Sequence, residues 1–144
     1  MPKRRRKPRV AVVDWRPAPA SIDGVKVEKQ VLGTVADVKY HLADTEKDFT
    51  PAILNADAII VWQNTDVTER TLAKMKNCCA LIRNGVGYDT VNIKTAARLG
   101  ISVCNVPDYG TEEVADHAIA LTLAQVRQLF PLDREAKKPA WKLH

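Results

Sequence analysis

The sequence predicts an α/β protein in which helices cover both faces of a parallel sheet of about five strands. Short runs rich in Val, Ile and Leu alternate about five times with segments of helical character. This alternation is typical of a doubly wound parallel sheet. The strand candidates are also nearly continuously apolar, as expected for strands that are buried on both faces.

The first strand is predicted over residues 9–14, where Arg-Val-Ala-Val-Val-Asp forms a valine-rich apolar run. Residues 15–22 contain Pro17 and Pro19 and are expected to form a loop. A helix is predicted over residues 25–32, with Gly33 as its C-terminal stop.

Residues 36–40 alternate between apolar and polar side chains and form the second strand candidate. A helix is expected over residues 46–55, although Pro51 fits a helix only in the first turn. Residues 56–62 are almost entirely apolar and indicate the third strand.

The next four elements are predicted as helix 68–75, strand 78–83, helix 92–99 and strand 101–104. Gly100 is expected to terminate the second of these helices. Short connections and right-handed crossovers make a flavodoxin-like order of strands the expected topology.

A long helix follows the sheet, and it is predicted over residues 111–129. Thr111-Glu-Glu-Val resembles a displaced capping box, with acidic residues at the positive end of the helix. Apolar residues occur around most of its circumference rather than along one stripe, which indicates burial from several sides. No further element is expected after Phe130.

The net charge of +5 arises from the N-terminus, because the first nine residues include six Lys and Arg residues. Without these six, 16 basic and 17 acidic residues remain, a net charge of −1. A solvated arm is the expected reading of this tail, and nucleic-acid binding is not expected because no aromatic residue is interleaved. Without a transmembrane run or a signal-peptide core, a cytoplasmic protein is the default.

The three cysteines, Cys78, Cys79 and Cys104, form no C-x-x-C pair. We therefore expect buried reduced thiols in strands, with no disulfide framework and no metal site.

Two loops lie where ligands of open α/β sheets bind, beyond the carboxyl ends of strands. The first, residues 84–90, carries Gly85 and Gly87, and its N–H groups could hold a small anion such as a carboxylate. The alternative is a tight turn that needs two permissive residues. The second loop, residues 105–111, leads into a helix N-terminus, where the Thr111 hydroxyl either caps the helix or contacts a ligand.

The first loop is not a dinucleotide-binding fingerprint. A third glycine would be required at position 90, which is Thr90. Asp108, which follows at about the right separation, lies after the next strand and a proline rather than at the end of a strand.

Two stretches closely resemble the D-isomer-specific 2-hydroxyacid dehydrogenases, a family that includes phosphoglycerate dehydrogenases and the C-terminal-binding-protein co-repressors. The first is Arg83-Asn-Gly-Val-Gly-Tyr-Asp-Thr-Val-Asn-Ile. The second runs from Ala96 through Cys-Asn-Val-Pro-Asp-Tyr-Gly-Thr-Glu-Glu-Val-Ala-Asp-His to Leu121. The similarity is dense from about Ala80 to Arg127 and looser from Val10 to Trp62.

This resemblance implies a function in which NAD exchanges hydride with a small 2-hydroxy or 2-oxo acid. Gly85, Val86 and Gly87 are then expected to bind the substrate, with the amides at Val86 and Gly87 holding its carboxylate. Thr111 is expected near the nicotinamide, and the helix 111–129 is expected to mediate a homodimer or other self-association.

The family's cofactor loop and its catalytic Arg, acidic residue and His match no position here, so no catalytic residue is assigned. His117 is expected to pack, not to act as acid or base. The implied organisation is a basic disordered tail (1–8), a flavodoxin-like substrate domain (9–105), an interdomain crossover helix (106–130) and a truncated stub of a missing NAD-binding domain (131–144).

Three functions remain open from the sequence. The first is the substrate-domain portion of a dehydrogenase, inactive by itself. The second is a non-catalytic, co-repressor-like module that binds other proteins. The third is a truncated product without a function of its own.

Overall fold

The computed structural model describes residues 6–15, 25–62 and 65–139. The chain forms two compact units, Met1–Pro107 and Asp108–His144. The predicted loop at 15–22 and most of the basic tail lie outside the described residues.

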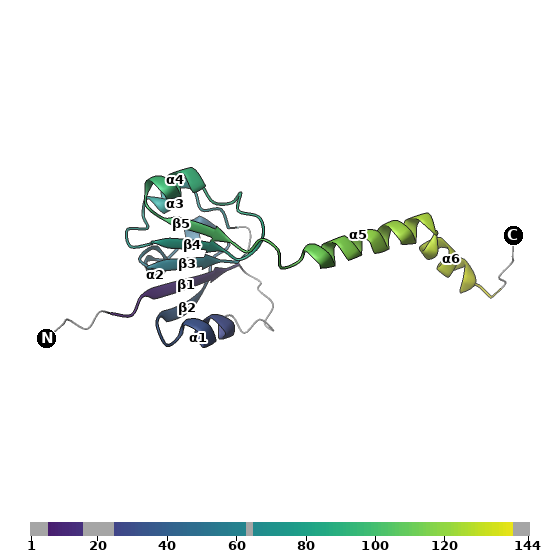
Figure 1. Ribbon diagram of the computed structural model, residues 1–144, viewed down its shortest axis with the longest axis horizontal. Helices are drawn as coiled ribbons and strands as arrows, with labels where there is room; N and C mark the ends of the chain where they lie inside the picture. The colour runs from purple at the N-terminus through teal and green to yellow at the C-terminus, as the bar shows by residue number, and fades with distance from the viewer. Residues whose placement is uncertain (1–5, 16–24, 63–64, 140–144) are drawn as a thin grey trace. The chain divides into compact units, whose positions relative to one another are not determined.

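The first unit is built on a five-stranded parallel sheet with the order β2-β1-β3-β4-β5 (Figure 1). This order confirms the flavodoxin-like, doubly wound topology. The strands begin and end within about two residues of the predicted positions. They are β1 (Arg9–Asp14), β2 (Asp37–Leu42), β3 (Ala58–Val61), β4 (Ala80–Arg83) and β5 (Ser102–Asn105).

The helices of this unit are shorter than the sequence suggests. They are α1 (Lys26–Leu32), α2 (Pro51–Leu54), α3 (Glu69–Leu72) and α4 (Ile93–Arg98). Asn92 caps α4 because its side chain accepts a hydrogen bond from the Thr95 N–H at 3.0 Å.

The single helix predicted over 46–55 is wrong. A 3-10 turn (Glu46–Asp48) is followed by extended Phe49, and α2 starts anew at Pro51. Each piece has its own cap: Thr45 and Asp48 form a capping box, and the Thr50 hydroxyl accepts from the Ile53 N–H. Pro51 is tolerated as the first residue of α2 because its missing N–H would have no partner there.

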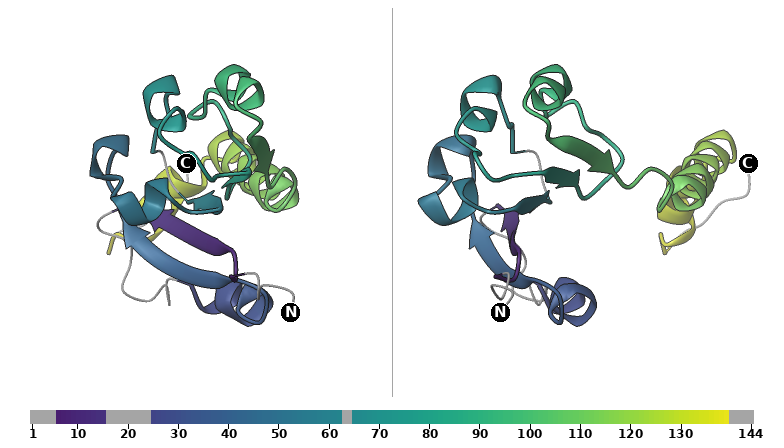
Figure 2. Two further views of the ribbon diagram at one scale, coloured as in Figure 1. Left: turned by 90° about the vertical axis from the view of Figure 1, so that its left-hand side faces the viewer. Right: turned by 60° about the vertical axis from the view of Figure 1, so that its left-hand side comes forward.

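Helices lie on both sides of the sheet (Figure 2), and a hydrophobic cluster covers each face. On one face, Ile53, Leu72 and Ala96 from α2, α3 and α4 pack against alternate strand residues such as Val13 and Leu81. On the other face, Val25 and Leu32 at the ends of α1 pack with Val10, Val12 and Val38. Helices on both faces of a parallel sheet are the arrangement that the alternating sequence predicts.

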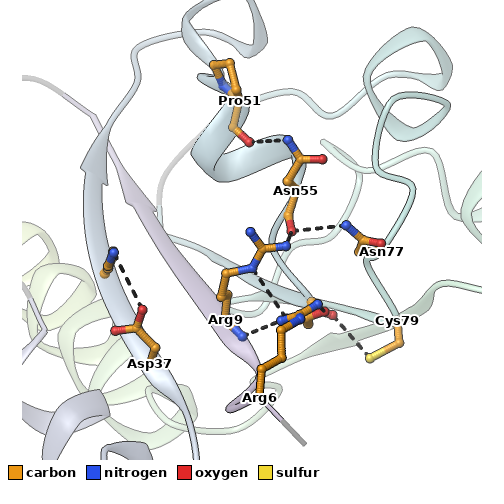
Figure 3. A network of polar contacts seen from close by, with 9 residues as sticks. Arg6, Arg9, Asp37, Pro51, Asn55, Asn77 and Cys79 are labelled. Carbon is orange, nitrogen blue, oxygen red and sulfur yellow. Dashed lines mark hydrogen bonds and ion pairs between the residues drawn. The ribbon is translucent and has the colours of Figure 1, made fainter.

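A polar network holds the amino-terminal end of the sheet (Figure 3). The Arg6 guanidinium donates two hydrogen bonds to the Asp57 carboxylate, at 2.6 and 2.7 Å. The Arg9 N–H donates to the same carboxylate at 2.7 Å. Lys7 donates to the Gly33 carbonyl at 3.1 Å. Arg6, Lys7 and Arg9 of the basic segment are therefore hydrogen-bonded to residues next to the sheet: Asp57 before β3 and Gly33 after α1.

The second unit differs from its prediction in two ways. The helix predicted over 111–129 ends earlier, as α5 (Thr111–Val126), because Gln128 adopts a left-handed backbone with φ of 52°. A further helix, α6 (Leu129–Ala136), forms where no element was expected after Phe130. Thr111 is not the N-cap of α5, which is Gly110 and makes no side-chain capping bond. The proposed displaced capping box is therefore wrong.

The expectation of buried thiols holds for Cys78 alone, since Cys79 and Cys104 are exposed. Cys104 lies in β5, the edge strand of the sheet, and Cys79 directly precedes β4. No helix in the described part of the chain is long and apolar enough to cross a membrane.

Candidate functional site

The glycine loop follows β4 at the carboxyl edge of the sheet and is tied to the end of β5. The Val106 N–H donates to the Gly85 carbonyl at 3.0 Å. The Asn105 side-chain amide donates to the Val86 carbonyl at 2.8 Å. Both carbonyls are thus engaged by the segment after β5, and the loop is held in one conformation.

Gly85 has no unusual backbone angle, and its lack of a side chain leaves space for the end of Arg83. Among the described residues, the only glycine with positive φ is Gly100. The interpretation of Gly85 and Gly87 as permissive turn residues is therefore wrong. A Cβ atom at Gly85 would instead collide with the Arg83 guanidinium.

Arg83 reaches this place from the end of β4. One of its terminal nitrogens, Nη1, donates to the Trp62 carbonyl at 3.1 Å and to the Asn84 carbonyl at 2.7 Å. The guanidinium therefore lies directly against Gly85, which is buried. No role for Arg83 at this position was predicted from the sequence. The sequence signal that could have indicated this contact is an arginine two residues before a glycine of the loop.

Two backbone N–H groups of the loop have no hydrogen-bond acceptor among the described residues. The Gly85 N–H is used, because it donates to the Arg83 carbonyl at 2.9 Å. In the part of the chain that the structure describes, the Val86 and Gly87 N–H groups donate to no protein acceptor. Both residues are exposed. Adjacent free N–H groups form the kind of concavity that binds a carboxylate. An Asp89 carboxylate oxygen lies 3.1 Å from the place that a Cβ at Gly87 would occupy.

Several buried polar atoms gather at the same edge of the sheet. Within the described residues, Trp62 Nε1, Arg83 Nε and Thr90 Oγ1 are buried without a hydrogen-bond partner. A cavity of about 570 Å³ beside β5 is lined in part by Tyr88 and Asn105. Of the loop, Tyr88 borders this cavity, whereas Gly85, Val86 and Gly87 are not among the residues that line it.

Asp14 is a buried carboxylate at the same edge of the sheet, and no role for it was predicted from the sequence. It ends β1, is 3% exposed, and accepts from the Trp15 N–H at 2.9 Å and the Tyr40 hydroxyl at 3.2 Å. Burial, together with the charge of Asp14, raises the pKa of Tyr40. These bonds join the ends of β1 and β2, so the pair has a structural role here.

Thr111 lies in the other unit, where it is the exposed first residue of α5. No group of three or more His, Cys, Asp or Glu side chains suited to a metal ion occurs among the described residues.

Comparison with known proteins shows which family the chain belongs to. Residues 16–132 match the model of the D-isomer specific 2-hydroxyacid dehydrogenase catalytic domain. D-3-phosphoglycerate dehydrogenase of Archaeoglobus fulgidus is 38% identical over 86 residues, which are 60% of this chain and 16% of that protein. The corresponding enzyme of Synechocystis is 30% identical over 122 residues, 85% of this chain and 22% of that protein. The chain thus spans less than a quarter of these curated relatives.

Solved structures share the fold. D-lactate dehydrogenase of Aquifex aeolicus, solved with NAD and lactic acid, has a TM-score of 0.72 at 23% identity over 92% of this chain and 39% of its own. An NADPH-dependent glyoxylate/hydroxypyruvate reductase of Sinorhizobium meliloti, solved with NADP and malonate, has a TM-score of 0.64 at 27% identity over 96% of this chain and 42% of its own. With its sheet order, its glycine loop and the match over residues 16–132, the chain belongs to the D-isomer specific 2-hydroxyacid dehydrogenase family, in the part that corresponds to the catalytic domain.

Proposed function

We propose that this chain is the substrate domain of an NAD-dependent D-2-hydroxyacid dehydrogenase, and that its glycine loop binds the carboxylate of a 2-hydroxy or 2-oxo acid. The observation that carries this proposal is the pair of open N–H groups at Val86 and Gly87. They lie next to Gly85, against which the Arg83 guanidinium packs. Charge-assisted hydrogen bonds to a carboxylate are about twice as strong as neutral ones.

The loop orients the acid through its backbone, which tolerates many side chains on the substrate. Two adjacent N–H donors fix the carboxylate plane, and Arg83 adds a positive charge beneath the loop. The Asn105 bond to the Val86 carbonyl keeps these donors in place before the acid arrives. Such preorganisation lowers the entropic cost of binding.

The described residues do not by themselves form a site for a nicotinamide dinucleotide. The glycine loop lacks the third glycine of the fingerprint, since position 90 is Thr90. We place Thr111 near the nicotinamide on the strength of the family resemblance and derive no catalytic step through the cofactor. The purified 144-residue chain is expected to bind the acid but to show no turnover with NADH.

The test is a titration of the ¹⁵N-labelled chain with glyoxylate, followed by NMR. The Val86 and Gly87 amide signals should shift together and saturate. Gly85→Ala should weaken the response, because its Cβ would force the end of the Arg83 side chain to move away from the loop. Gly110→Ala is the matched control, since a Cβ there meets no atom within 4 Å. Shifts spread evenly over the chain, or an unchanged response in Gly85→Ala, would overturn the proposal.

We also propose that the second unit mediates self-association. Val114, Ile119, Leu123 and Val126 of α5 and Phe130 of α6 are all more than half exposed. Large exposed apolar surfaces mark contact sites, and these exposed residues lie on two consecutive helices. Sedimentation equilibrium should show a dimer that Ile119→Glu dissociates. A monomer at all concentrations would refute the proposal.

A further inference from the structure

A second, smaller cavity lies far from the glycine loop in the sequence, on the face of the sheet that α2 covers. Its volume is about 120 Å³, and β1, β2 and α2 contribute its walls. Four polar residues line it: Arg9, Asp37, Lys39 and His41. Alanines contribute much of the rest, including Ala11, Ala52 and Ala56.

The pairing of β1 with β2 explains this arrangement. Asp37, Lys39 and His41 alternate along β2 and therefore project from one face. Their partners in the register are Arg9, Ala11 and Val13. Ala11 and Val13 belong to the cluster under α2, so the three polar side chains project from that same face. α2 is short and contributes Ala52 here, and Ala56 follows the helix, so small side chains leave space that larger ones would fill.

Positive charge exceeds negative charge around this cavity. The Lys39 Nζ is 3.6 Å from the Asp37 carboxylate, a pair in which both side chains are at least half exposed. Arg9 donates to the Asn55 carbonyl at 2.6 Å, and its Nε is 3.8 Å from the Asp57 carboxylate (Figure 3). Asp57 is itself paired with Arg6. Among the residues that line the cavity, Arg9 and Lys39 are cationic, and Asp37, which pairs with Lys39, is the one carboxylate.

His41 shows how this environment acts on a titrating group. Burial is the larger cause that lowers the pKa of His41, and the positive charge of Lys39 lowers it further. From the neighbouring segments, β1 contributes Arg9 as a charged lining group, α2 contributes Ala52, and Ala56 comes from the residues after α2. An anion in the cavity would offset the repulsion between Lys39 and protonated His41.

We propose that this cavity binds a small carboxylate with a short apolar body. The carboxylate lies among Arg9, Lys39 and His41, and the apolar body contacts Ala52 and Ala56. The half-polar, half-alanine lining favours such a molecule over a fully polar ion, since burying apolar surface contributes about 25 cal/mol per Å². This site is independent of the glycine loop and of the proposed function.

The competing explanation concerns the sheet edge. β2 is an edge strand, and inward-pointing charged residues on edge strands prevent pairing with other chains. Under that explanation Lys39 and His41 have no ligand. The two explanations differ in a measurable way, because only a bound anion changes the titration of His41.

The experiment is an NMR titration of the three histidines of the full chain in sodium propionate, compared with sodium chloride at equal ionic strength. We expect propionate to raise the pKa of His41 by about half a unit or more, as a nearby opposite charge does. His117, which is exposed on α5, serves as the internal reference and should not change.

Two variants separate the charge from the cavity. Lys39→Gln should weaken propionate binding about tenfold, which corresponds to about 1.4 kcal/mol, whereas Lys47→Gln on the exposed 3-10 turn should not. Ala52→Leu should fill the cavity and abolish binding without changing any charge. Ala73→Leu, an exposed alanine after α3, is its matched control. Equal His41 titrations in propionate and chloride would overturn the proposal and leave edge protection as the explanation.

Discussion

Replacing Asp57 by Asn should destabilise the first unit through the loss of one charge. The Asp57 carboxylate accepts three hydrogen bonds, two from Arg6 and one from the Arg9 N–H. The Asn side chain keeps one oxygen, so it can still accept from Arg9. Its amide nitrogen would face the Arg6 guanidinium, which is also a donor, and that contact would be lost.

The expected magnitude follows from the pKa of Asp57. The Arg6 hydrogen bonds, followed by the Arg9 N–H, lower this pKa from 3.8 to about 2. At 1.36 kcal/mol per pKa unit, this difference corresponds to about 2.5 kcal/mol. The Arg6 side chain is 59% exposed, however, and solvent screens the pair. We therefore expect a loss of about 1 kcal/mol at neutral pH.

The pH dependence has a definite sign. Because the folded-state pKa of Asp57 is lowered, its contribution to stability is fully present above about pH 4 and is lost as the pH falls towards 2. The wild-type free energy of unfolding should therefore decrease more steeply than that of Asp57→Asn in this window. Above pH 5 the two curves should be parallel.

Urea denaturation followed by circular dichroism at pH 7, 5, 4 and 3 measures both effects. Asp66→Asn, at an exposed position, is the control and should change stability by less than about 0.5 kcal/mol. In the double variant Arg6→Ala/Asp57→Asn, the loss should be smaller than the sum of the two single losses. Strict additivity, or parallel curves down to pH 3, would refute the reasoning.

Two further predictions concern single residues. Gln128→Gly should raise the stability of the second unit by about 0.5–1 kcal/mol. The reason is that Gln128 has a φ of 52°, which glycine adopts without strain. A lower midpoint in thermal unfolding would contradict this prediction. Burial raises the pKa of the Cys78 thiol to about 11, so iodoacetamide at pH 8 should label the exposed Cys79 and Cys104 well before Cys78. Mass spectrometry of tryptic peptides measures the order, and equal rates for all three would count against it.

The sheet could be predicted from the sequence because its signal is local. Runs such as residues 9–14 and 56–62 are apolar enough that only a buried strand accommodates them. The alternation with helices then restricts the topology to a few possibilities, and the order of the five strands follows from short right-handed connections.

The ends of the helices were harder to predict, since caps compete with helical periodicity. Thr50 and Pro51 start a new helix inside an apparently continuous one. Gln128 separates α5 from α6 because its backbone is left-handed, and nothing in its side chain requires that conformation. Both breaks depend on backbone hydrogen bonds that periodicity does not encode.

For the site, the position of the glycine loop was predictable but its chemistry was not. The loop follows a strand, so its location at the carboxyl edge is given by the fold. The conformation of the loop, and so which of its N–H groups have no acceptor, depends on Arg83 and Asn105. Their side chains donate hydrogen bonds to the carbonyls of Asn84 and Val86. Such contacts become visible only when the strands are placed side by side.

The packing of Arg83 against Gly85 also has an evolutionary consequence. A Cβ at position 85 would meet the guanidinium of Arg83, so position 85 can accept a side chain only where the residue at position 83 moves aside or is smaller. Homologues with a small residue at position 83 should accept alanine at position 85, while those with arginine should keep glycine. The two positions should therefore covary as a pair, and a combined replacement should be milder than Gly85→Ala alone.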